Sequence, residues 1–205
     1  MGNPSLFRPP EEMRELELLQ ELERNPVISQ RELSHKFGVA LGVTNACLRR
    51  MARRGWIRIT GFNHHKIGYY LTPTGFAEKA KLTVHLISWT VQHYSALKDL
   101  IGSRLLEMQN RGVERIVFYG VSEEMEVAYV TLQGVNLKLI GIVEDKDRMS
   151  QKEVFGFDVK ELHQIEILKP DGVLITSLTG LEKRLESVRK FVNPEKTKIY
   201  TISTY

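Results

Sequence analysis

The sequence predicts an α+β domain over residues 1–75, a long linker helix over 76–112 and an α/β domain over 113–205. In the first part, short helical patterns precede two β-rich runs around a polar tip. The middle part keeps helical periodicity from residue 76 to residue 110. In the last part, short apolar runs alternate with helical segments, which favours a Rossmann-like parallel sheet.

The composition is that of a globular protein. Of 205 residues, 42% are hydrophobic and 26% are charged, which supplies a core and excludes a disordered or collagen-like chain. No run approaches the ~18 apolar residues of a membrane span, and the first residues lack the apolar core of a signal peptide. The single cysteine, Cys47, excludes an internal disulfide. We therefore expect a cytoplasmic protein that does not enter a membrane.

Positive charge is concentrated in the first half. Residues 1–112 carry sixteen Lys/Arg and ten Asp/Glu, a balance of +6, whereas residues 113–205 carry thirteen and fifteen, a balance of −2. Between residues 31 and 66, eight basic residues face a single acid, Glu32. This asymmetry indicates a polyanion-binding domain fused to a second domain, and a solvated helix face is the alternative.

The first part contains signals for three helices and a hairpin. Prolines and acids at 9–12 start a helix that Asn25 and Pro26 end. Ser29 and Glu32 form a capping box for a short helix to residue 37. A second short helix should run over 40–54, and a hairpin should pair 56–60 with 66–71. This order of elements predicts a winged helix-turn-helix domain.

The long helix carries an apolar stripe with a seven-residue period. Its members are Ile87, Tyr94, Ile101 and Met108, with Val91, Leu97 and Leu105 at neighbouring positions. Such a stripe on a helix between domains predicts a homodimer seam through residues 76–112. Packing on the helix's own domain is the alternative.

The helix at 40–54 has two different faces at 100° per residue. Thr44, Leu48 and Met51 gather on the face that should be buried. The opposite face carries small and basic side chains, which suit a major groove because Arg and Asn pair with purine edges. Other cations and hydroxyls nearby are placed for phosphate contacts. The residues predicted to contact double-stranded DNA are Ser29, Gln30, Arg31, Lys36, Gly42, Asn45, Ala46, Arg49, Arg50, Arg53, Arg54, Arg58, His64, His65 and Lys66.

No metal site is expected from the histidine pair in the hairpin. His64 and His65 are adjacent, and neighbouring residues of a strand point to opposite faces, which makes chelation poor.

Several motifs of the first half resemble one family. They read Gln-Arg-Glu-Leu at 30–33, Leu-Gly-Val at 41–43, Asn-Ala-Cys-Leu at 45–48 and Leu-Thr-Pro-Thr-Gly at 71–75. They are similar to motifs of MarR-type regulators associated with exopolysaccharide gene clusters. The resemblance covers residues 12–100 and implies a transcriptional regulator of surface-polysaccharide genes. Ala40 departs from the family, in which a serine is expected to cap the recognition helix.

The loop at 120–125 lies where a dinucleotide-binding loop would place three glycines. Gly120 is the first, Ser122 and Met125 replace the other two, and Glu123 suits a helix start but would repel a phosphate. Acids that could hold a ribose follow the next predicted strand. The predicted ligand-binding residues are Gly120, Ser122, Glu123, Glu144 and Asp145. A Rossmann-like fold without a dinucleotide is the alternative.

The second half also resembles known domains. The runs at 139–145, 154–156 and 170–176 are similar to those of Rossmann-like domains in sugar acyltransferases and nucleotide-sugar enzymes of polysaccharide biosynthesis. The resemblance implies a nucleotide, nucleotide-sugar or CoA-type ligand. Together with the loop at Gly120, the effector expected is a nucleotide, a dinucleotide or a nucleotide-sugar, and no cofactor is required. We see no catalytic constellation, because no Ser-x-x-x-Lys or Tyr-x-x-x-Lys pair occurs in this half.

Together these observations predict a DNA-binding transcriptional regulator. Its second domain would sense a nucleotide-type ligand or support dimerisation. The alternatives are a nucleotide-sugar-modifying enzyme with a DNA-binding arm, and a ligand-free protein-interaction module.

Overall fold

The structure is a computed structural model that describes residues 11–61 and 67–202. The chain forms two compact units, residues 1–93 (the N-terminal unit) and residues 94–205 (the C-terminal unit). The boundary falls inside the long helix, so the two units divide that helix between them. The division predicted from the sequence, with residues 76–112 as a linker and dimerisation helix, stays a prediction.

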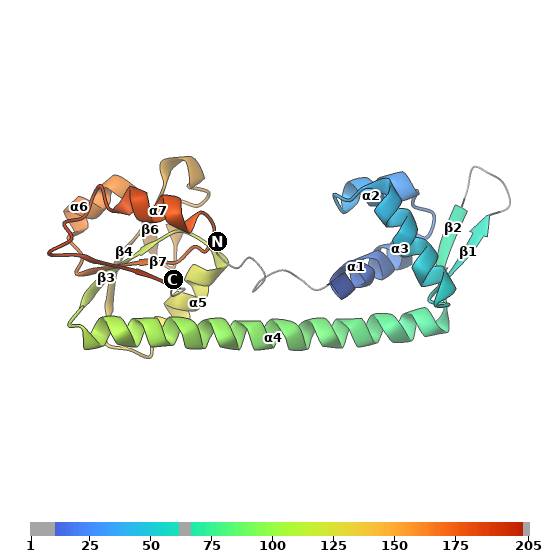
Figure 1. The fold of residues 1–205 in the computed structure, drawn as a ribbon, viewed down its shortest axis with the longest axis horizontal. Coiled ribbons are helices and arrows are strands. Elements are labelled where there is room, and N and C mark those ends of the chain that lie inside the picture. The colour runs from blue at the N-terminus through green and yellow to red at the C-terminus, as the bar shows by residue number, and fades with distance from the viewer. Residues whose placement is uncertain (1–10, 62–66, 203–205) are drawn as a thin grey trace. The chain divides into compact units, whose positions relative to one another are not determined.

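The N-terminal unit begins with three helices, α1 (Glu11–Arg24), α2 (Gln30–Lys36) and α3 (Leu41–Arg53) (Figure 1). The predicted capping box is present at the start of α2. The Ser29 backbone N–H donates to Glu32 Oε2 at 2.8 Å, and the Glu32 N–H donates to Ser29 Oγ at 3.1 Å. At the start of α3, Ala40 provides no side-chain cap, so its first N–H groups stay available.

The three helices are followed by an antiparallel hairpin of β1 (Ile57–Gly61) and β2 (Ile67–Leu71). This order is the winged helix-turn-helix arrangement that the sequence predicted. The core combines side chains from every element of the unit. Its fully buried members include Leu16, Leu19, Leu22, Leu33, Leu48, Met51 and Tyr69.

Helix α4 (Pro73–Asn110) starts three residues earlier than predicted. The Thr72 hydroxyl accepts the Gly75 N–H at 3.0 Å and so caps the first turn. A Cβ at Gly75 would lie 1.9 Å from the Trp56 carbonyl oxygen. The glycine therefore permits a close contact between the helix start and the hairpin, and it does not break the helix.

The C-terminal unit is built on a six-stranded sheet in the order β5-β6-β4-β3-β7-β8. All neighbouring strands are parallel except the short edge strand β5, which pairs antiparallel with β6. The five parallel strands have the order of a Rossmann sheet. The chain adds β4 and β6 on one side of β3 and then adds β7 and β8 on its other side. The strands are β3 (Arg115–Tyr119), β4 (Lys138–Glu144), β5 (Glu153–Val154), β6 (Phe157–Glu161), β7 (Gly172–Ile175) and β8 (Lys198–Thr201).

Helices cover both faces of this sheet (Figure 1). One face packs against α4 and α5 (Glu123–Leu132), and the other against α6 (Ile165–Leu168) and α7 (Leu181–Val188). Two 3₁₀ turns, Lys146–Arg148 and Leu162–Gln164, complete the unit. The predicted α/β domain with a parallel sheet is therefore confirmed.

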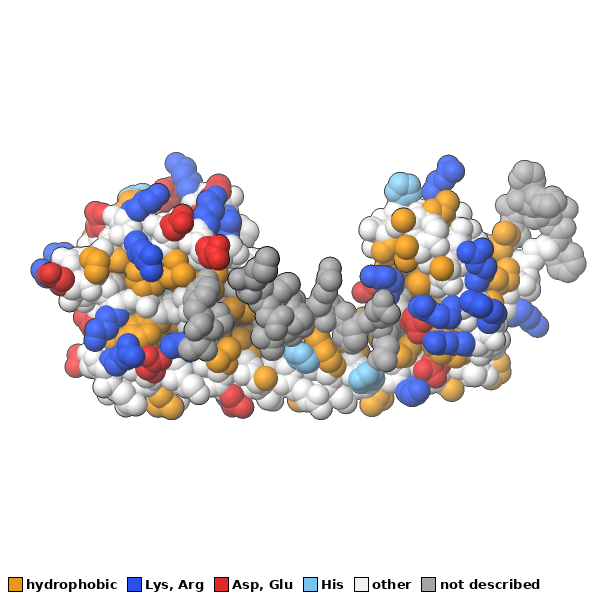
Figure 2. Space-filling model, viewed as in Figure 1, with side chains coloured by type: hydrophobic (Ala, Val, Ile, Leu, Met, Phe, Trp, Pro, Cys, Tyr) orange, Lys and Arg blue, Asp and Glu red, His pale blue; other side chains and the backbone are white. Residues whose placement is uncertain are grey.

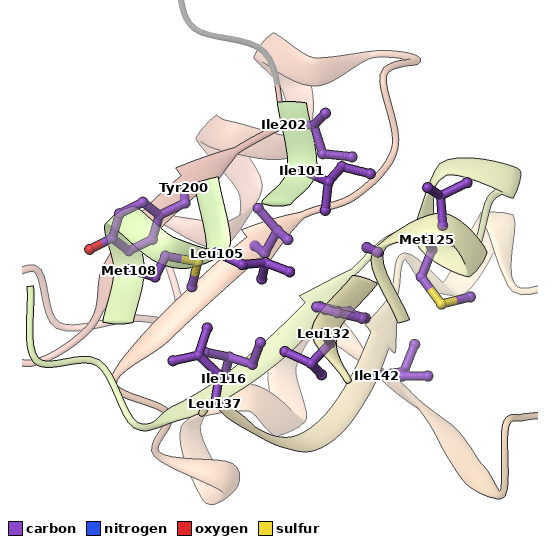
Figure 3. Close-up of a cluster of buried hydrophobic side chains, with 14 of the residues drawn as sticks. Ile101, Leu105, Met108, Ile116, Met125, Leu132, Leu137, Ile142, Tyr200 and Ile202 are labelled. Atoms are coloured by element: carbon purple, nitrogen blue, oxygen red, sulfur yellow. The ribbon is translucent and has the colours of Figure 1, made fainter. Parts of the chain in front are cut away.

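The second half of the predicted dimer stripe is part of this core. Ile101, Leu105 and Met108 are fully buried, and they pack in one cluster with Tyr200 and Ile202 of the last strand region (Figure 3). The prediction that they form an intermolecular seam is wrong, because the sheet of their own unit covers them. The alternative of packing on the helix's own domain applies to this half of α4.

We predict that Ile101→Ala lowers the free energy of unfolding of the C-terminal unit by about 2–5 kcal/mol, because it leaves a cavity in a filled core. Urea unfolding followed by far-UV circular dichroism measures this loss. Both tryptophans, Trp56 and Trp89, lie in the N-terminal unit, so the fluorescence transition should stay unchanged. Ile167→Ala is the matched control, since Ile167 is 79% exposed. Equal effects of the two substitutions would contradict the packing described.

Candidate functional site

The two faces of α3 are those that the sequence predicted. Thr44, Cys47, Leu48 and Met51 are buried against the rest of the unit. The opposite face is exposed and consists of small and basic side chains. Its members are Gly42, Ala46, Arg49 and Arg53, and Asn45 beside them is half-buried. Within the described part of the chain, Arg49 and Arg53 form no ion pair, so their guanidinium groups are available to a ligand.

A buried carboxylate on α1 holds two other arginines of α3. Glu15 is 7% exposed. It accepts from Arg50 Nε at 2.8 Å and lies 3.3 Å from Arg54 Nη1. Arg54 also lies over the Trp56 ring, with its guanidinium carbon 4.8 Å from the ring centroid. These two arginines, predicted to contact DNA, are therefore engaged within the protein and fix α3 against α1.

Some residues at the start of the helix-turn-helix, which the sequence predicted to contact DNA, also have partners within the protein. The Lys36 ammonium lies 2.7 Å from the carboxylate of Glu21, which is 7% exposed. Gln30 Nε2 donates to the Tyr69 hydroxyl at 2.8 Å. Ser29 caps α2, and its backbone hydrogen bond to Glu32 lowers the pKa of that carboxyl. In the same region Arg31 is exposed.

The hairpin places the predicted Arg58 beside Tyr70, a residue that was not predicted to contact DNA. Arg58 on β1 faces Tyr70 on β2, and both side chains are exposed. The Tyr70 ring lies over Gly68, where a Cβ would come within 2.7 Å of it. A phenol hydroxyl beside a guanidinium suits a phosphate. Figure 2 shows Lys and Arg side chains gathered over α3 and the base of this hairpin. His64, His65 and Lys66 lie outside the described residues.

In the C-terminal unit, Gly120 follows β3 and lies so close to Ser177, which follows β7, that no side chain fits there. Its φ is +113°, and a Cβ there would lie 2.9 Å from Ser177 Cβ. The Thr176 hydroxyl donates to the Gly120 carbonyl at 2.6 Å, which ties the loop after β3 to the end of β7. Ser122 accepts the Met125 N–H at 3.3 Å and so caps α5, while Glu123 is exposed in the first turn.

The predicted ribose acid Glu144 is occupied within the protein. It is 1% exposed. Its Oε1 accepts from Arg184 Nη1 at 2.6 Å and its Oε2 accepts the Val121 N–H at 2.8 Å. Both oxygens therefore already hold the loop and α7 in place, so a ribose would have to displace one of these bonds, and the role of Glu144 in ribose binding stays a prediction.

Asp145 is the more accessible of the two acids and accepts from the Tyr119 hydroxyl at 2.7 Å. Burial, together with this hydrogen bond, raises the pKa of Tyr119 well above its ordinary value. Burial disfavours the charged form of Arg184, but the hydrogen bond and charge of Glu144 outweigh it and raise the pKa of Arg184. Phenol and guanidinium therefore both keep their protons at neutral pH.

Two residues that organise these regions were missed, although a sequence signal existed for each. Glu15 follows the spacing of the buried leucines of α1, and Arg184 follows that of Leu181 and Val188 on α7. A charged residue at an apolar position of a helical stripe indicates a buried side chain that needs an opposite charge.

Two further properties concern the described residues only. Among them, no three His, Cys, Asp or Glu side chains are grouped so that they could hold a metal ion. None of their helices is both long and apolar enough to cross a membrane.

Residues 14–58 match the family model of winged helix-turn-helix DNA-binding domains. The segment includes α2, α3 and most of α1, together with the first strand residues. The N-terminal unit therefore contains a winged helix-turn-helix domain of the DNA-binding class. No curated protein sequence matches the chain.

Several solved structures are similar at low identity. A MarR family protein of Mycobacterium tuberculosis, in complex with salicylic acid, is 19% identical with a TM-score of 0.35, over 40% of this chain and 62% of that protein. MepR, which regulates the multidrug efflux pump MepA of Staphylococcus aureus, is 15% identical with a TM-score of 0.37, over 50% and 78%. RSP, a Rex-family repressor, is 14% identical with a TM-score of 0.33, over 99% and 88%.

We predict that Glu144→Gln lowers the free energy of unfolding of the C-terminal unit by about 3–5 kcal/mol, because it leaves the buried Arg184 without its charge partner. Urea unfolding followed by circular dichroism measures the change. Glu153→Gln, at an exposed glutamate of the same unit, should stay within about 0.5 kcal/mol of the parent. The double variant Glu144→Gln/Arg184→Met should recover part of the loss. A single substitution as mild as the control would contradict the role given to the pair.

Proposed function

We propose that this protein is a transcriptional regulator that binds double-stranded DNA through α3. The observation that carries the proposal is the exposed stripe of α3, where Arg49 and Arg53, which form no ion pair among the residues that the structure describes, lie beside small residues. Gly42 and Ala46 let the helix backbone approach the major groove closely. Arg49 and Arg53 can then reach guanine O6 and N7.

Phosphate contacts would come from residues around this helix. Arg31 and Arg58 are exposed, and they form no ion pair within the described residues. The uncapped start of α3 presents backbone N–H groups and the positive end of its dipole, which suits a phosphate. Lys36 pairs with Glu21, and Arg50 and Arg54 share the single carboxylate of Glu15, so these three are proposed to contribute less to DNA binding than Arg49 and Arg53.

We further propose a homodimer through the first half of α4 alone. Apolar side chains recur there at spacings of three and four residues, and all of them are exposed. They are Ala77, Ala80, Val84, Ile87, Val91 and Tyr94. This is the heptad pattern of a two-helix seam. A two-fold dimer would place its half-sites about 34 Å apart on one face of the duplex.

The proposed targets are surface or exopolysaccharide genes, on the resemblance of the motifs at 30–33, 41–43, 45–48 and 71–75. The C-terminal unit is proposed to sense a nucleotide-type ligand or to support dimerisation. For such a ligand the candidates are Gly120, Ser122, Glu123, Glu144 and Asp145. Melting curves with adenine nucleotides and nucleotide-sugars test for a sensor, since a saturating ligand raises Tm. Turnover of a nucleotide-sugar would favour an enzyme.

We predict that Arg49→Ala and Arg53→Ala each weaken binding to the DNA upstream of the chain's own gene by about 1–3 kcal/mol, and reduce discrimination against unrelated DNA, because each removes a contact to a base edge. Arg58→Ala should weaken binding to all sequences alike and reduce the salt slope by about 0.9 per protomer. Fluorescence anisotropy titrations at several salt concentrations measure both effects.

Arg189→Ala is the matched control for these titrations, since it removes an exposed arginine of the C-terminal unit. It should leave affinity and specificity unchanged. Binding by the parent that is weak and indifferent to sequence would overturn the proposed function.

We predict that the double variant Ile87→Asp/Val91→Asp is a monomer at concentrations where the parent sediments as a dimer, because four buried like charges would face one another across the seam. Its circular dichroism should match the parent, since both side chains are 58% exposed in the single chain. Gln92→Asp, on the same turn but outside the stripe, is the control and should remain dimeric. A parent that sediments as a monomer would refute the seam.

A further inference from the structure

The C-terminal unit contains a hollow of about 610 Å³ at the edge of the sheet where β7 and β8 begin. The loop at Gly120 lies beyond the opposite edge, where β3 ends. The hollow is therefore separate from the position at which a Rossmann-type sheet usually binds a nucleotide. Its volume falls within the range of small-molecule sites, about 300–1,000 Å³.

Three lysines line this hollow. They are Lys169 after α6, Lys190 after α7, and Lys196 before β8. Within the described part of the chain, none of them forms an ion pair or a side-chain hydrogen bond. The whole region 113–205 has a balance of −2, so a gathering of free ammonium groups runs against the charge of its surroundings.

The end of a helix accounts for only part of this charge. Lys190 follows α7, where the carbonyl end of the helix attracts a cation. Lys196 lies in the loop before β8, six residues further along the chain, and α6 is a single turn with little dipole. The three lysines together therefore need another explanation.

Lys169 supplies a second, independent observation. Its backbone has φ +46° and ψ +60°, the left-handed conformation that favours glycine or asparagine. A lysine there costs backbone energy, and among the described residues its side chain forms no hydrogen bond or ion pair that would offset this cost. Strain at a residue that lines a cavity is typical of a binding position.

The other lining residues complete a site of mixed character. Ile165 and Pro170 are buried, and Phe191 and Val192 are half-buried, which gives the hollow an apolar wall. Asp171 also lines it, and its Oδ2 accepts the backbone N–H groups of the residues that start β3, at 3.2 and 2.8 Å. These bonds hold part of the carboxylate charge within the sheet. Glu166 also lines the hollow and is exposed, so three lysines face one exposed carboxylate and one that is partly engaged.

We propose that this hollow binds a small phosphorylated molecule, with its phosphate groups between Lys169, Lys190 and Lys196 and its apolar part against Phe191 and Val192. Ammonium groups on flexible stems bind phosphate as point charges. The concave shape and limited volume favour a small molecule over a peptide. The inference rests on the C-terminal unit alone and does not depend on DNA binding.

The test is a calorimetric titration of the full-length chain with inorganic pyrophosphate and with ADP. We expect saturable binding of both, and tighter binding of ADP because its ring system covers the apolar wall. Lys190→Gln/Lys196→Gln should weaken pyrophosphate binding about a hundredfold, at about tenfold for each charged contact. Lys152→Gln/Lys183→Gln, at two exposed lysines that do not line the hollow, is the matched control and should leave binding unchanged.

The variant Lys169→Gly distinguishes a role of Lys169 in ligand binding from a role in stabilising the fold. Glycine relieves the left-handed backbone, so the melting temperature without ligand should not fall, while pyrophosphate affinity should drop about tenfold. Amide chemical-shift changes on titration should fall on residues 165–171 and 190–197. Absence of binding, or binding that survives all three lysine substitutions, would overturn the proposal. Shifts confined to residues 120–125 would also overturn it, since they would place the ligand at the other edge of the sheet.

Discussion

A carboxylate that leaves water must be paired with a positive charge, and this constraint decides which cations of the chain remain available. In the N-terminal unit, the buried Glu15 holds Arg50 of α3 and Arg54 at the end of that helix. Arg49 and Arg53, on the outer side, are left for a ligand. The basic cluster in the sequence thus separates into an internal group that orients the helix and an external group that can bind.

The same constraint shapes the C-terminal unit. Glu144, at the end of β4, takes Arg184 from α7 and the Val121 N–H from the loop after β3. With Gly120 packed on Ser177, the loop that looks like a degraded phosphate loop is closed by its own neighbours. The basic hollow at the other edge of the sheet has no buried acid of this kind among its lining residues.

Most of the fold was predictable because local signals and tertiary packing agree. Ser29 and Glu32 placed the start of α2, and the change from helical to strand-like periodicity placed the sheet after α4. Two features were missed for local reasons. The long helix was expected to begin after Gly75, but the missing Cβ of this glycine permits a close contact with the Trp56 backbone, and the helix already begins at Pro73. The turn between β5 and β6 has Phe155 at φ +53°, where a turn signal would require asparagine or glycine.

The candidate interface was only half predictable. Helical periodicity assigns Arg49 and Arg53 to the outer face of α3, because it depends on the sequence alone. It cannot reveal that Arg50 meets Glu15, thirty-five residues away, since that pairing follows from the packing of α1 on α3. In the same way, a heptad repeat predicts an apolar helix face but does not show which surface covers that face. The stripe of α4 faces outward at Ile87 and packs on its own sheet at Ile101.

This division of α4 means that the two halves of the helix are packed into their cores at different times during synthesis, since N-terminal parts of a chain fold first. Leu82 and Leu86 belong to the core of the N-terminal unit, so that core is complete once residue 93 has left the ribosome. Ile101, Leu105 and Met108 emerge soon afterwards, but Tyr200 and Ile202, which pack with them, follow only after the other strands of the sheet (Figure 3). Val113, Ile116 and Phe118 belong to the same cluster and can pack on this half of the helix first. The apolar face of the second half of α4 is therefore fully shielded from water only when the last strand has joined the sheet.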